Sequence, residues 1–184
     1  MPHALPTHQD VLAAAQRLKG LVVRTPLLRH DALDELVGAE VFVKPECLQE
    51  TGSFKLRGAT NRLLQIPEDK KQFGVVAFSS GNHAQGVSRA AKRLSMPALI
   101  VMPSDAPSVK IEGVRADGAE IHLYDRNSES REEISARIAA ERNAVLVPSY
   151  DDNDIIAGQG TVGLEIAEQV AAFGVPLDHY ICCT

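Results

Sequence analysis

One short stretch of the chain places a lysine where a lysine is unusual. Gly52 permits a tight turn, Ser53 can cap a helix, and Lys55 falls in the first turn of that helix. The positive end of a helix dipole disfavours a cation there, and together with partial desolvation it lowers the pKa of the lysine. Such a lysine supplies the neutral amine that attacks carbonyl groups. From its local context alone, a surface lysine remains the simpler interpretation of Lys55.

A second polar stretch, residues 79–86, reads Ser-Ser-Gly-Asn-His-Ala-Gln-Gly and joins an apolar run to a helical one. At the carboxyl edge of a parallel sheet, such a junction presents free backbone N–H groups to an anion. Ser79, Ser80 and Asn82 add short polar side chains. A structural cap would explain one residue of the run Ser-Ser-Gly-Asn at 79–82 and not all four, so we expect an anion- or substrate-binding loop. For His83, a hydrogen-bonded residue at a helix start is as good an interpretation as an acid or base.

Glycines recur in a third stretch, residues 157–161, which reads Ala-Gly-Gln-Gly-Thr. It matches neither a P-loop nor the dinucleotide fingerprint, and close packing of helices explains it. The three cysteines include the neighbours Cys182 and Cys183 and form no Cys-x-x-Cys motif. We therefore expect reduced thiols and no metal site in this chain.

The elements that must position these residues alternate between helices and strands. Thr7, with Asp10 three residues later, predicts the start of a first helix that Gly20 closes. Further helices are predicted at 31–37, 53–64, 82–94, 107–116, 129–142 and 155–173. Strands are predicted at 40–44, 75–78, 98–102, 120–124, 144–147 and 180–183. The alternation indicates an α/β fold, a parallel sheet flanked by helices in three layers.

Composition supports this fold class and narrows the function. The chain has 184 residues, 45% hydrophobic and 4% aromatic with no Trp, so its core must consist mostly of Val, Ile, Leu and Ala, as in covered parallel sheets. The net charge is −5 and no Lys/Arg block occurs, which excludes nucleic acid and membrane surfaces as expected partners. No apolar run approaches the roughly 20 residues of a membrane helix. The N-terminus has no signal-peptide pattern, and we expect a soluble, cytoplasmic enzyme.

Taken together, the three stretches resemble a known family. Residues 44–59, Lys-Pro-Glu-Cys-Leu-Gln-Glu-Thr-Gly-Ser-Phe-Lys-Leu-Arg-Gly-Ala, resemble the cofactor-lysine motif of the serine/threonine dehydratases and serine racemases. These are pyridoxal phosphate enzymes of the tryptophan-synthase-β fold (fold type II). Residues 79–86 resemble their substrate-carboxylate loop. Residues 101–103, 118–120 and 157–161 also fall in the order and spacing of that family.

The resemblance implies a role for each matching residue. Lys55 is implied to hold pyridoxal 5'-phosphate covalently and later to move the α-proton of the substrate, with Phe54 packed near the cofactor ring and Asn82 hydrogen-bonded to the ring hydroxyl. The backbone N–H groups implied to bind the substrate carboxylate belong to Ser79, Ser80, Gly81, Asn82 and His83. The cofactor stores the electrons of the broken Cα–H bond. Loss of the β-hydroxyl from serine, threonine or hydroxyaspartate then yields a 2-oxo acid and ammonia.

Ser80 leaves alternatives open within the family. Threonine dehydratases often have alanine at this position, whereas serine racemases and hydroxyaspartate dehydratases tend to have serine. A hydroxyl on the cofactor face opposite Lys55 could deliver or remove a proton there, and so permit racemisation or elimination from another stereoisomer. β-Replacement enzymes of the same fold generally have a threonine-rich loop, so the Ser-Ser-Gly-Asn-His form favours a dehydratase. A non-catalytic binding or regulatory fragment is a further alternative, and the presence of Lys55 and Asn82 argues against it.

The resemblance also predicts how the chain divides. Residues 1–52 would form the N-terminal part of a large domain, 53–154 a complete small α/β domain, and 155–184 a segment that returns to the large domain. Members of the family continue into a glycine-rich loop for the cofactor phosphate, and several have an acidic site for a divalent metal. We expect both features, and most of the homodimer interface of a full-length enzyme, to lie beyond Thr184.

Overall fold

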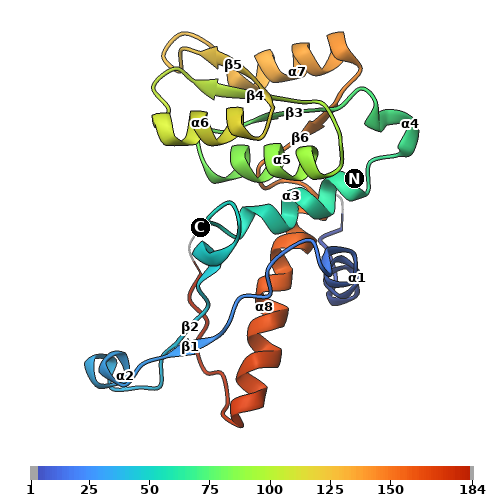
Figure 1. Cartoon of the computed structure of the whole chain (residues 1–184). Helices are drawn as coiled ribbons and strands as arrows, with labels where there is room; N and C mark the ends of the chain where they lie inside the picture. The colour runs from blue at the N-terminus through green and yellow to red at the C-terminus, as the bar shows by residue number, and fades with distance from the viewer. Residues whose placement is uncertain (1–3, 183–184) are drawn as a thin grey trace.

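A four-stranded parallel sheet forms the middle of the chain. The structure, a computed structural model, describes residues 4–182. The strands of this sheet are β3 (Val75–Phe78), β4 (Ala98–Pro103), β5 (Glu120–Tyr124) and β6 (Val145–Val147). Their order is β5-β4-β3-β6, and every neighbouring pair is parallel. The sheet sits in the upper half of the molecule in Figure 1.

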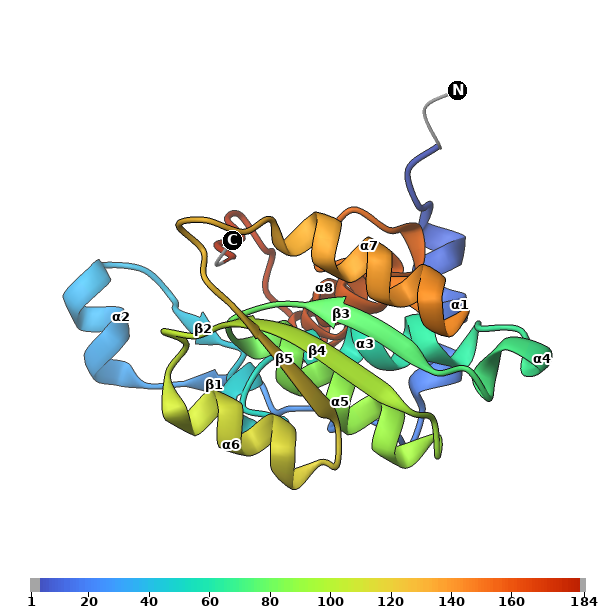
Figure 2. The same ribbon diagram turned by 90° about the horizontal axis from the view of Figure 1, so that it is seen from above.

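Helices cover both faces of this sheet, as Figure 2 shows from above. Helices α5 (Asn82–Arg93) and α6 (Ser108–Ala116) lie on one face and α7 (Arg131–Arg142) on the other. Side chains of a strand point alternately to the two faces, so Val75 and Ala77 join the core under α5, while Val76 joins the core under α7. The expected three-layer α/β arrangement is confirmed.

A second group of helices extends below the sheet. Helix α3 (Lys55–Leu64) crosses α8 (Asn153–Phe173), and α1 (His8–Leu18) packs on both. The crossing is tight because glycines face each other: a Cβ on Gly158 would lie 2.6 Å from Cα of Gly58. The glycines of the third stretch therefore pack helices, as expected from the sequence.

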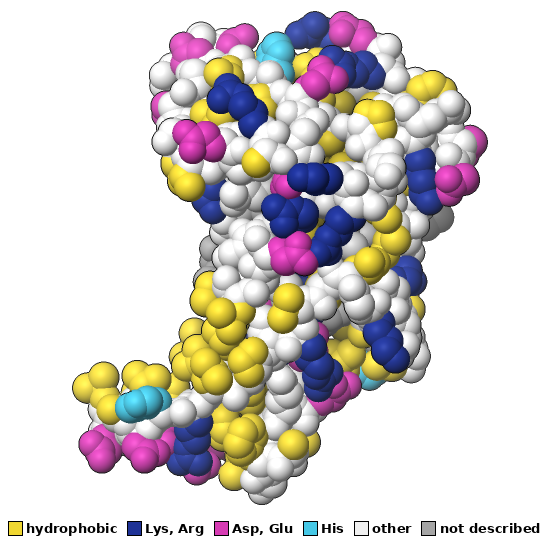
Figure 3. All heavy atoms as spheres, viewed as in Figure 1, with side chains coloured by type: hydrophobic (Ala, Val, Ile, Leu, Met, Phe, Trp, Pro, Cys, Tyr) yellow, Lys and Arg dark blue, Asp and Glu magenta, His cyan; other side chains and the backbone are white. Residues whose placement is uncertain are grey.

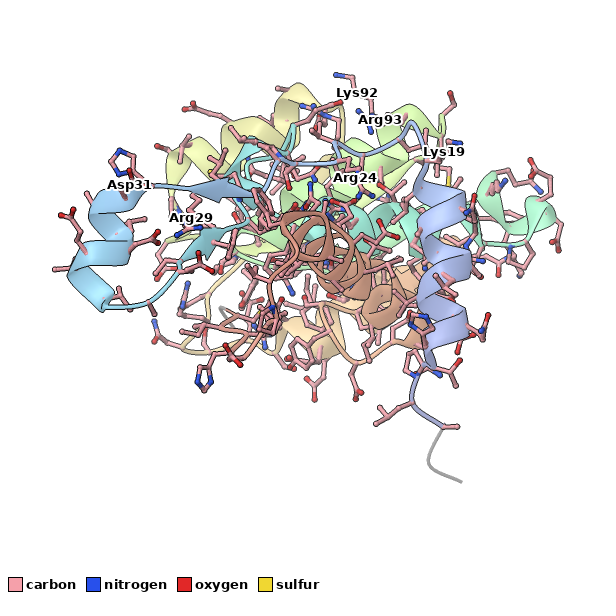
Figure 4. All side chains as sticks on the ribbon, turned by 90° about the horizontal axis from the view of Figure 1, so that it is seen from below. Lys19, Arg24, Arg29, Asp31, Lys92 and Arg93 are labelled. Atoms are coloured by element: carbon pink, nitrogen blue, oxygen red, sulfur yellow. The ribbon has the colours of Figure 1, made fainter. Side chains whose placement is uncertain are left out.

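The N-terminal segment runs beside α8. Strands β1 (Leu28–Arg29) and β2 (Phe42–Val43) form a separate antiparallel pair, with α2 (Asp31–Val37) between them. Seen from below, α8 lies nearly end-on between this pair and α1, with Arg24 beside it and Arg29 further out toward α2 (Figure 4). Two short elements complete the described residues, η1 (Glu46–Leu48) and α4 (Glu68–Lys71).

Several predicted bounds require correction. The strand predicted at 180–183 is wrong for residues 180–182, which belong to neither sheet, and Cys183 lies outside the described residues. The strand predicted at 40–44 shortens to two residues, and the helix predicted from Glu129 begins at Arg131 because Ser130 caps it through the Glu133 N–H. The Thr7–Asp10 capping box forms as predicted. Among residues 4–182, the helices are all too short or too polar to cross a membrane.

Candidate functional site

Lys55 is the first residue of α3 and is half-buried. Its Nζ donates a hydrogen bond to the Ser149 carbonyl oxygen at 3.2 Å and lies 5.3 Å from the centre of the Phe54 ring. The Ser149 hydroxyl in turn donates to the carbonyl of Phe78 at the end of β3. The lysine amine is thus held at the carboxyl edge of the sheet by the segment that follows β6.

The expected cap of α3 is wrong. The residue at the cap position is Phe54, and no side chain caps the helix. The Ser53 hydroxyl is buried instead, and no hydrogen bond to it occurs within residues 4–182. Without a side-chain acceptor, the first N–H groups of α3 keep their partial positive charge next to Lys55.

Lys55 lines a pocket of about 380 Å³. Its walls come from Ser149 and Tyr150 after β6, and from Ile155, Ile156 and Gln159 of α8. Burial lowers the pKa of the Lys55 amine below its ordinary value. The uncharged amine is therefore present at lower pH than for a solvent-exposed lysine, and it faces an open, mostly apolar space.

The loop 79–83 connects β3 to α5. The Ser79 hydroxyl accepts a hydrogen bond from the Gly81 N–H at 3.2 Å, and no side chain caps α5. Ser80 and Asn82 are exposed. A loop of this kind with an uncapped helix start can bind an anion through backbone N–H groups.

Helix α5 approaches Lys55 closely. A Cβ on Gly86 would lie 3.1 Å from the Lys55 carbonyl oxygen, so a residue with a side chain here would need a small shift of α5 or α3. The contact brings the loop and the lysine to the same side of the molecule. The loop residues 79–83 are nevertheless not among those that line the pocket of Lys55.

His83 is almost fully buried behind the loop. Its Nε2 lies 3.4 Å from the Val147 carbonyl oxygen, and Nδ1 has no hydrogen-bond partner within residues 4–182. Burial lowers the His83 pKa to about 4; the Val147 carbonyl opposes this shift, and the charge of Lys55 adds to it. The imidazole is therefore neutral near pH 7.

Asn82, the first residue of α5, makes a different contact. Its Oδ1 accepts a hydrogen bond from Lys110 Nζ at 2.8 Å, and the same ammonium donates to Gln85 Oε1 at 2.9 Å. The amide group of Asn82 thus keeps its NH₂ donors for another partner.

Sequence reasoning missed two residues beside the lysine, Ser149 and Gln159. Ser149 contributes a backbone carbonyl, which no side-chain pattern can reveal. Gln159 lies between the two glycines of the third stretch; it accepts a hydrogen bond from the Gly58 N–H at 3.1 Å and also lines the pocket. No group of three or more His, Cys, Asp or Glu residues able to hold a metal ion occurs within residues 4–182.

Comparison with known proteins places this geometry in a family. A protein-family model described as "Pyridoxal-phosphate dependent enzyme" matches residues 18–184. The chain is 50% identical to an L-threo-3-hydroxyaspartate ammonia-lyase from a Pseudomonas species over 95% of its own length and 53% of that protein. It is 44% identical to an L-threonine ammonia-lyase from Thermotoga maritima over 89% of its own length and 41% of that protein.

A solved structure of maize serine racemase has the same fold. It superimposes with a TM-score of 0.88 at 40% identity, covering 91% of this chain and 51% of the racemase. The chain therefore spans about half the length of the proteins it matches. The matched region includes both Lys55 and the loop at residues 79–83. The chain belongs to the family of pyridoxal-phosphate dependent enzymes.

Proposed function

We propose that the chain provides the cofactor lysine and the substrate-carboxylate loop of a pyridoxal phosphate-dependent amino-acid ammonia-lyase. The observation that supports this most directly is the position of Lys55. Its amine faces a pocket of about 380 Å³, and burial lowers its pKa. A neutral amine beside an open pocket is what covalent attachment of an aldehyde cofactor needs.

The residues present fit pyridoxal phosphate. Ile155 and Ile156 give the pocket an apolar wall, and its volume is in the range of small-molecule sites. Phe54 would pack near the cofactor ring, and the free NH₂ of Asn82 would donate to the ring hydroxyl. When bound, the cofactor supplies an electron sink for the bond broken at the substrate Cα.

Binding of the substrate would fall to the loop between β3 and α5. The backbone N–H groups of residues 79–83 would hold the amino-acid carboxylate, since the uncapped start of α5 attracts an anion. Lys55 would then remove the proton from Cα, which requires the neutral amine that its lowered pKa favours. Departure of the β-hydroxyl as water would leave an enamine, which tautomerises to an imine and is hydrolysed by water to a 2-oxo acid and ammonia.

The substrates we propose are serine, threonine and 3-hydroxyaspartate. The named relatives support this class, as they are a hydroxyaspartate ammonia-lyase, a threonine ammonia-lyase and a serine racemase. The exposed hydroxyl of Ser80 favours a second candidate, a serine racemase or a hydroxyaspartate dehydratase, because it could exchange a proton on the face opposite Lys55.

Ser80→Ala separates these candidates in any form of the protein that turns over substrate. If Ser80 is the second acid or base, the variant loses about 100-fold or more in exchange of the α-proton from one stereoisomer and keeps the other. Proton exchange in deuterated water, followed for D- and L-serine and both hydroxyaspartate series, measures this. Equal loss for both stereoisomers would assign Ser80 to binding alone.

The remaining features of the proposal concern the whole protein. We infer a small domain at residues 53–154 that closes on a large domain to which 1–52 and 155–184 belong, and a cytoplasmic homodimer. The exposed apolar side chains of the lower half, among them Phe173 and Leu177, support further protein covering this region. We place the divalent metal site that several family members have outside the described residues 4–182, which contain no group of three or more His, Cys, Asp or Glu able to hold one.

Addition of pyridoxal phosphate tests the proposed role of Lys55. The absorbance spectrum is recorded for the 184-residue chain, for a chain extended through any coding sequence after Thr184, and for the Lys55→Ala variant of each. Borohydride reduction followed by peptide mass spectrometry locates the modified residue. We expect a visible band and an adduct on Lys55 that the variant lacks.

The outcome decides between enzyme and binding module. A Lys55-dependent band only in the extended chain would mean that a working enzyme needs the further sequence. A band of equal intensity in the Lys55→Ala variants, or none in any form, would refute the assignment of Lys55 and favour a non-catalytic binding module.

A further inference from the structure

A fully buried arginine stands two residues after Lys55 on α3. The guanidinium of Arg57 makes a two-pronged pair with Glu46, Nε to Oε2 and Nη2 to Oε1, both at 2.8 Å. It makes a second such pair with Glu165, Nη1 to Oε1 at 2.7 Å and Nη2 to Oε2 at 3.0 Å. The Thr161 hydroxyl and the Val23 carbonyl accept its remaining hydrogen bonds. All five N–H donors of Arg57 are therefore used.

The charges around Arg57 balance. Lys44, also buried, donates to Glu165 at 2.6 Å, to Gln169 at 2.8 Å and to the Thr25 carbonyl at 2.7 Å. Two cations and two carboxylates thus form a neutral set, which we call the Arg57 cluster (Lys44, Glu46, Arg57 and Glu165). Removing one charged side chain of the cluster would leave an opposite charge buried without its partner. A lone buried charge strongly destabilises a fold.

The Arg57 cluster joins the two walls of the Lys55 pocket. Arg57 lies two positions after Lys55 in the first turn of α3, and Glu165 lies on α8 nearly two turns beyond Gln159, which lines the pocket. Well-packed apolar residues of similar volume often stabilise a fold as much as a buried ion pair does, or more. Stability alone therefore does not account for the charged side chains of the cluster. Rigid, planar pairs on both edges of a guanidinium instead fix one orientation of α3 against α8.

We propose that Arg57 is a positioning residue for Lys55, which holds the start of α3 against α8 through Glu46 and Glu165 so that the lysine amine stands in its pocket. This inference rests on the proposed function of Lys55. Arg57 itself does not line the pocket. Its effect passes through the backbone of α3.

The environment of Lys55 makes the amine a sensitive reporter of this position. Burial is the cause of its lowered pKa. The groups around it are the Ser149 carbonyl, His83 of α5, which is neutral near pH 7, and the side chains of Tyr150, Tyr180 and Cys182, which line the same pocket. A small outward shift of α3 would hydrate the amine and return its pKa toward the ordinary value.

Competitive acetylation without cofactor measures this directly. The chain is labelled with trace acetic anhydride between pH 6 and 11 (roughly the span in which lysine amines titrate), and mass-spectrometric fragmentation quantifies the label on Lys55. The variants are Arg57→Lys, which keeps the charge but cannot form two-pronged pairs, and Glu165→Gln, which keeps one acceptor and removes a charge. Thr161→Val is the mildest change, since it keeps all four charges of the cluster; it removes the 3.3 Å hydrogen bond from Arg57 and the 2.7 Å hydrogen bond that the Thr161 hydroxyl donates to the Gly158 carbonyl.

The matched control is Arg142→Lys. Arg142 also forms a two-pronged pair, with Glu120 at 2.8 and 2.9 Å, but on the exposed surface between α7 and β5. We expect the Lys55 pKa to rise toward that of the surface lysines in Arg57→Lys and Glu165→Gln, to rise less in Thr161→Val, and to stay unchanged in Arg142→Lys. Urea unfolding of each variant verifies that it is folded.

Two results would overturn the inference. One is a folded Arg57→Lys or Glu165→Gln variant in which Lys55 titrates as in the wild type. The other is a wild-type Lys55 that titrates like the surface lysines, because the cluster would then have no position to maintain. Neither depends on the cofactor, so failure of the proposed function shows separately, as a missing adduct on Lys55.

Discussion

At the scale of single residues, burial shifts the pKa of two titratable groups near the proposed site, Lys55 and His83. Burial lowers the pKa of both, and the charge of Lys55 lowers that of His83 further. The His83 imidazole is therefore neutral near pH 7, and Lys55 reaches its neutral form at a lower pH than an exposed lysine does. The backbone N–H groups of the loop can meet the charge of an anionic ligand beside these residues.

His83 gives stability a specific dependence on pH. Its pKa is about 4 in the fold and 6.5 as an ordinary histidine, so the unfolded chain binds more protons between these values. Stability from this group is complete above pH 6.5 and is lost as the pH falls toward 4, on the order of 3 kcal/mol in total. Urea unfolding at a series of pH values from about 7.5 to about 4.5 measures how steeply the free energy of unfolding depends on pH.

The variant His83→Gln isolates the contribution. We expect its free energy of unfolding to change less over the same pH range, whatever its value at pH 7. His8→Gln, a change at an exposed histidine, should keep the wild-type slope. If His83→Gln and the wild type have equal slopes, the buried imidazole is not the group responsible.

The sequence could predict which residues belong to the candidate site. It could not predict the contacts that these residues make. Lys55 at a helix start and the polar loop after β3 were visible as patterns of residue types. The Ser149 carbonyl beside the lysine was not, because a backbone contact between positions 94 residues apart depends on the whole fold. The sequence predicts a helix from Ser53 with Ser53 as its cap, but the cap position is Phe54 and the helix begins at Lys55, because residue type does not determine the exact start.

At the scale of elements, the crossing of α3 and α8 determines the shape of the pocket. Gly58 and Gly158 let the two backbones approach closely, and the Gly58 N–H donates to Gln159 across the crossing. Both helices contribute residues to the pocket. A substitution that changes the distance between the helices therefore changes the shape of the pocket, even when the substituted residue does not line it.

Substitution of glycine by alanine should change the free energy of unfolding in opposite directions at two positions of α8. A Cβ on Gly158 would lie 2.6 to 2.9 Å from atoms of Gly58, Asn61 and Arg57, so Gly158→Ala must push the helices apart. We expect a loss of about 1 to 3 kcal/mol in the free energy of unfolding. A Cβ on Gly163 meets nothing within 4 Å, so Gly163→Ala should gain up to about 1 kcal/mol through helix propensity.

Guanidinium unfolding curves of both variants compare them directly. A stabilising Gly158→Ala would show that α3 and α8 can separate freely, and would remove the argument that their crossing is fixed. The Lys55 pKa in Gly158→Ala, measured by the same labelling, should move with the separation.

Periodicity predicted the long elements and failed for the short ones. The strands β3 to β6 and their covering helices follow from apolar runs that alternate with helical spacing. The four residues of α4 and the two of β1 are too few to produce a pattern. The predicted strand at 180–183 has the composition of a buried strand, but a strand also needs a neighbour, and the sheets of residues 4–182 offer it none.

At the scale of the whole molecule, the upper and lower halves differ in how well apolar residues are covered. Helices cover both faces of the parallel sheet, whereas the lower half exposes several large apolar side chains (Figure 3). Leu36 of α2 is 82% exposed, Val37 is 61% exposed, and Phe173 at the end of α8 is 53% exposed. Surfaces of this kind associate with other protein.

We expect the isolated chain to self-associate through this region. Sedimentation velocity at rising protein concentration should show a growing mean sedimentation coefficient. Replacing Leu36 and Val37 together by lysine and glutamate should raise the concentration at which this begins. Leu5→Lys, a change at another exposed leucine, should not; an equal effect of both would indicate nonspecific aggregation.

The Arg57 cluster also determines when the surroundings of Lys55 can be completed during synthesis. Glu165 leaves the ribosome 108 residues after Arg57, a delay of about 5 to 20 seconds. Until then α8 is missing from the pocket wall, so the burial that lowers the pKa of the Lys55 amine is incomplete in the nascent chain.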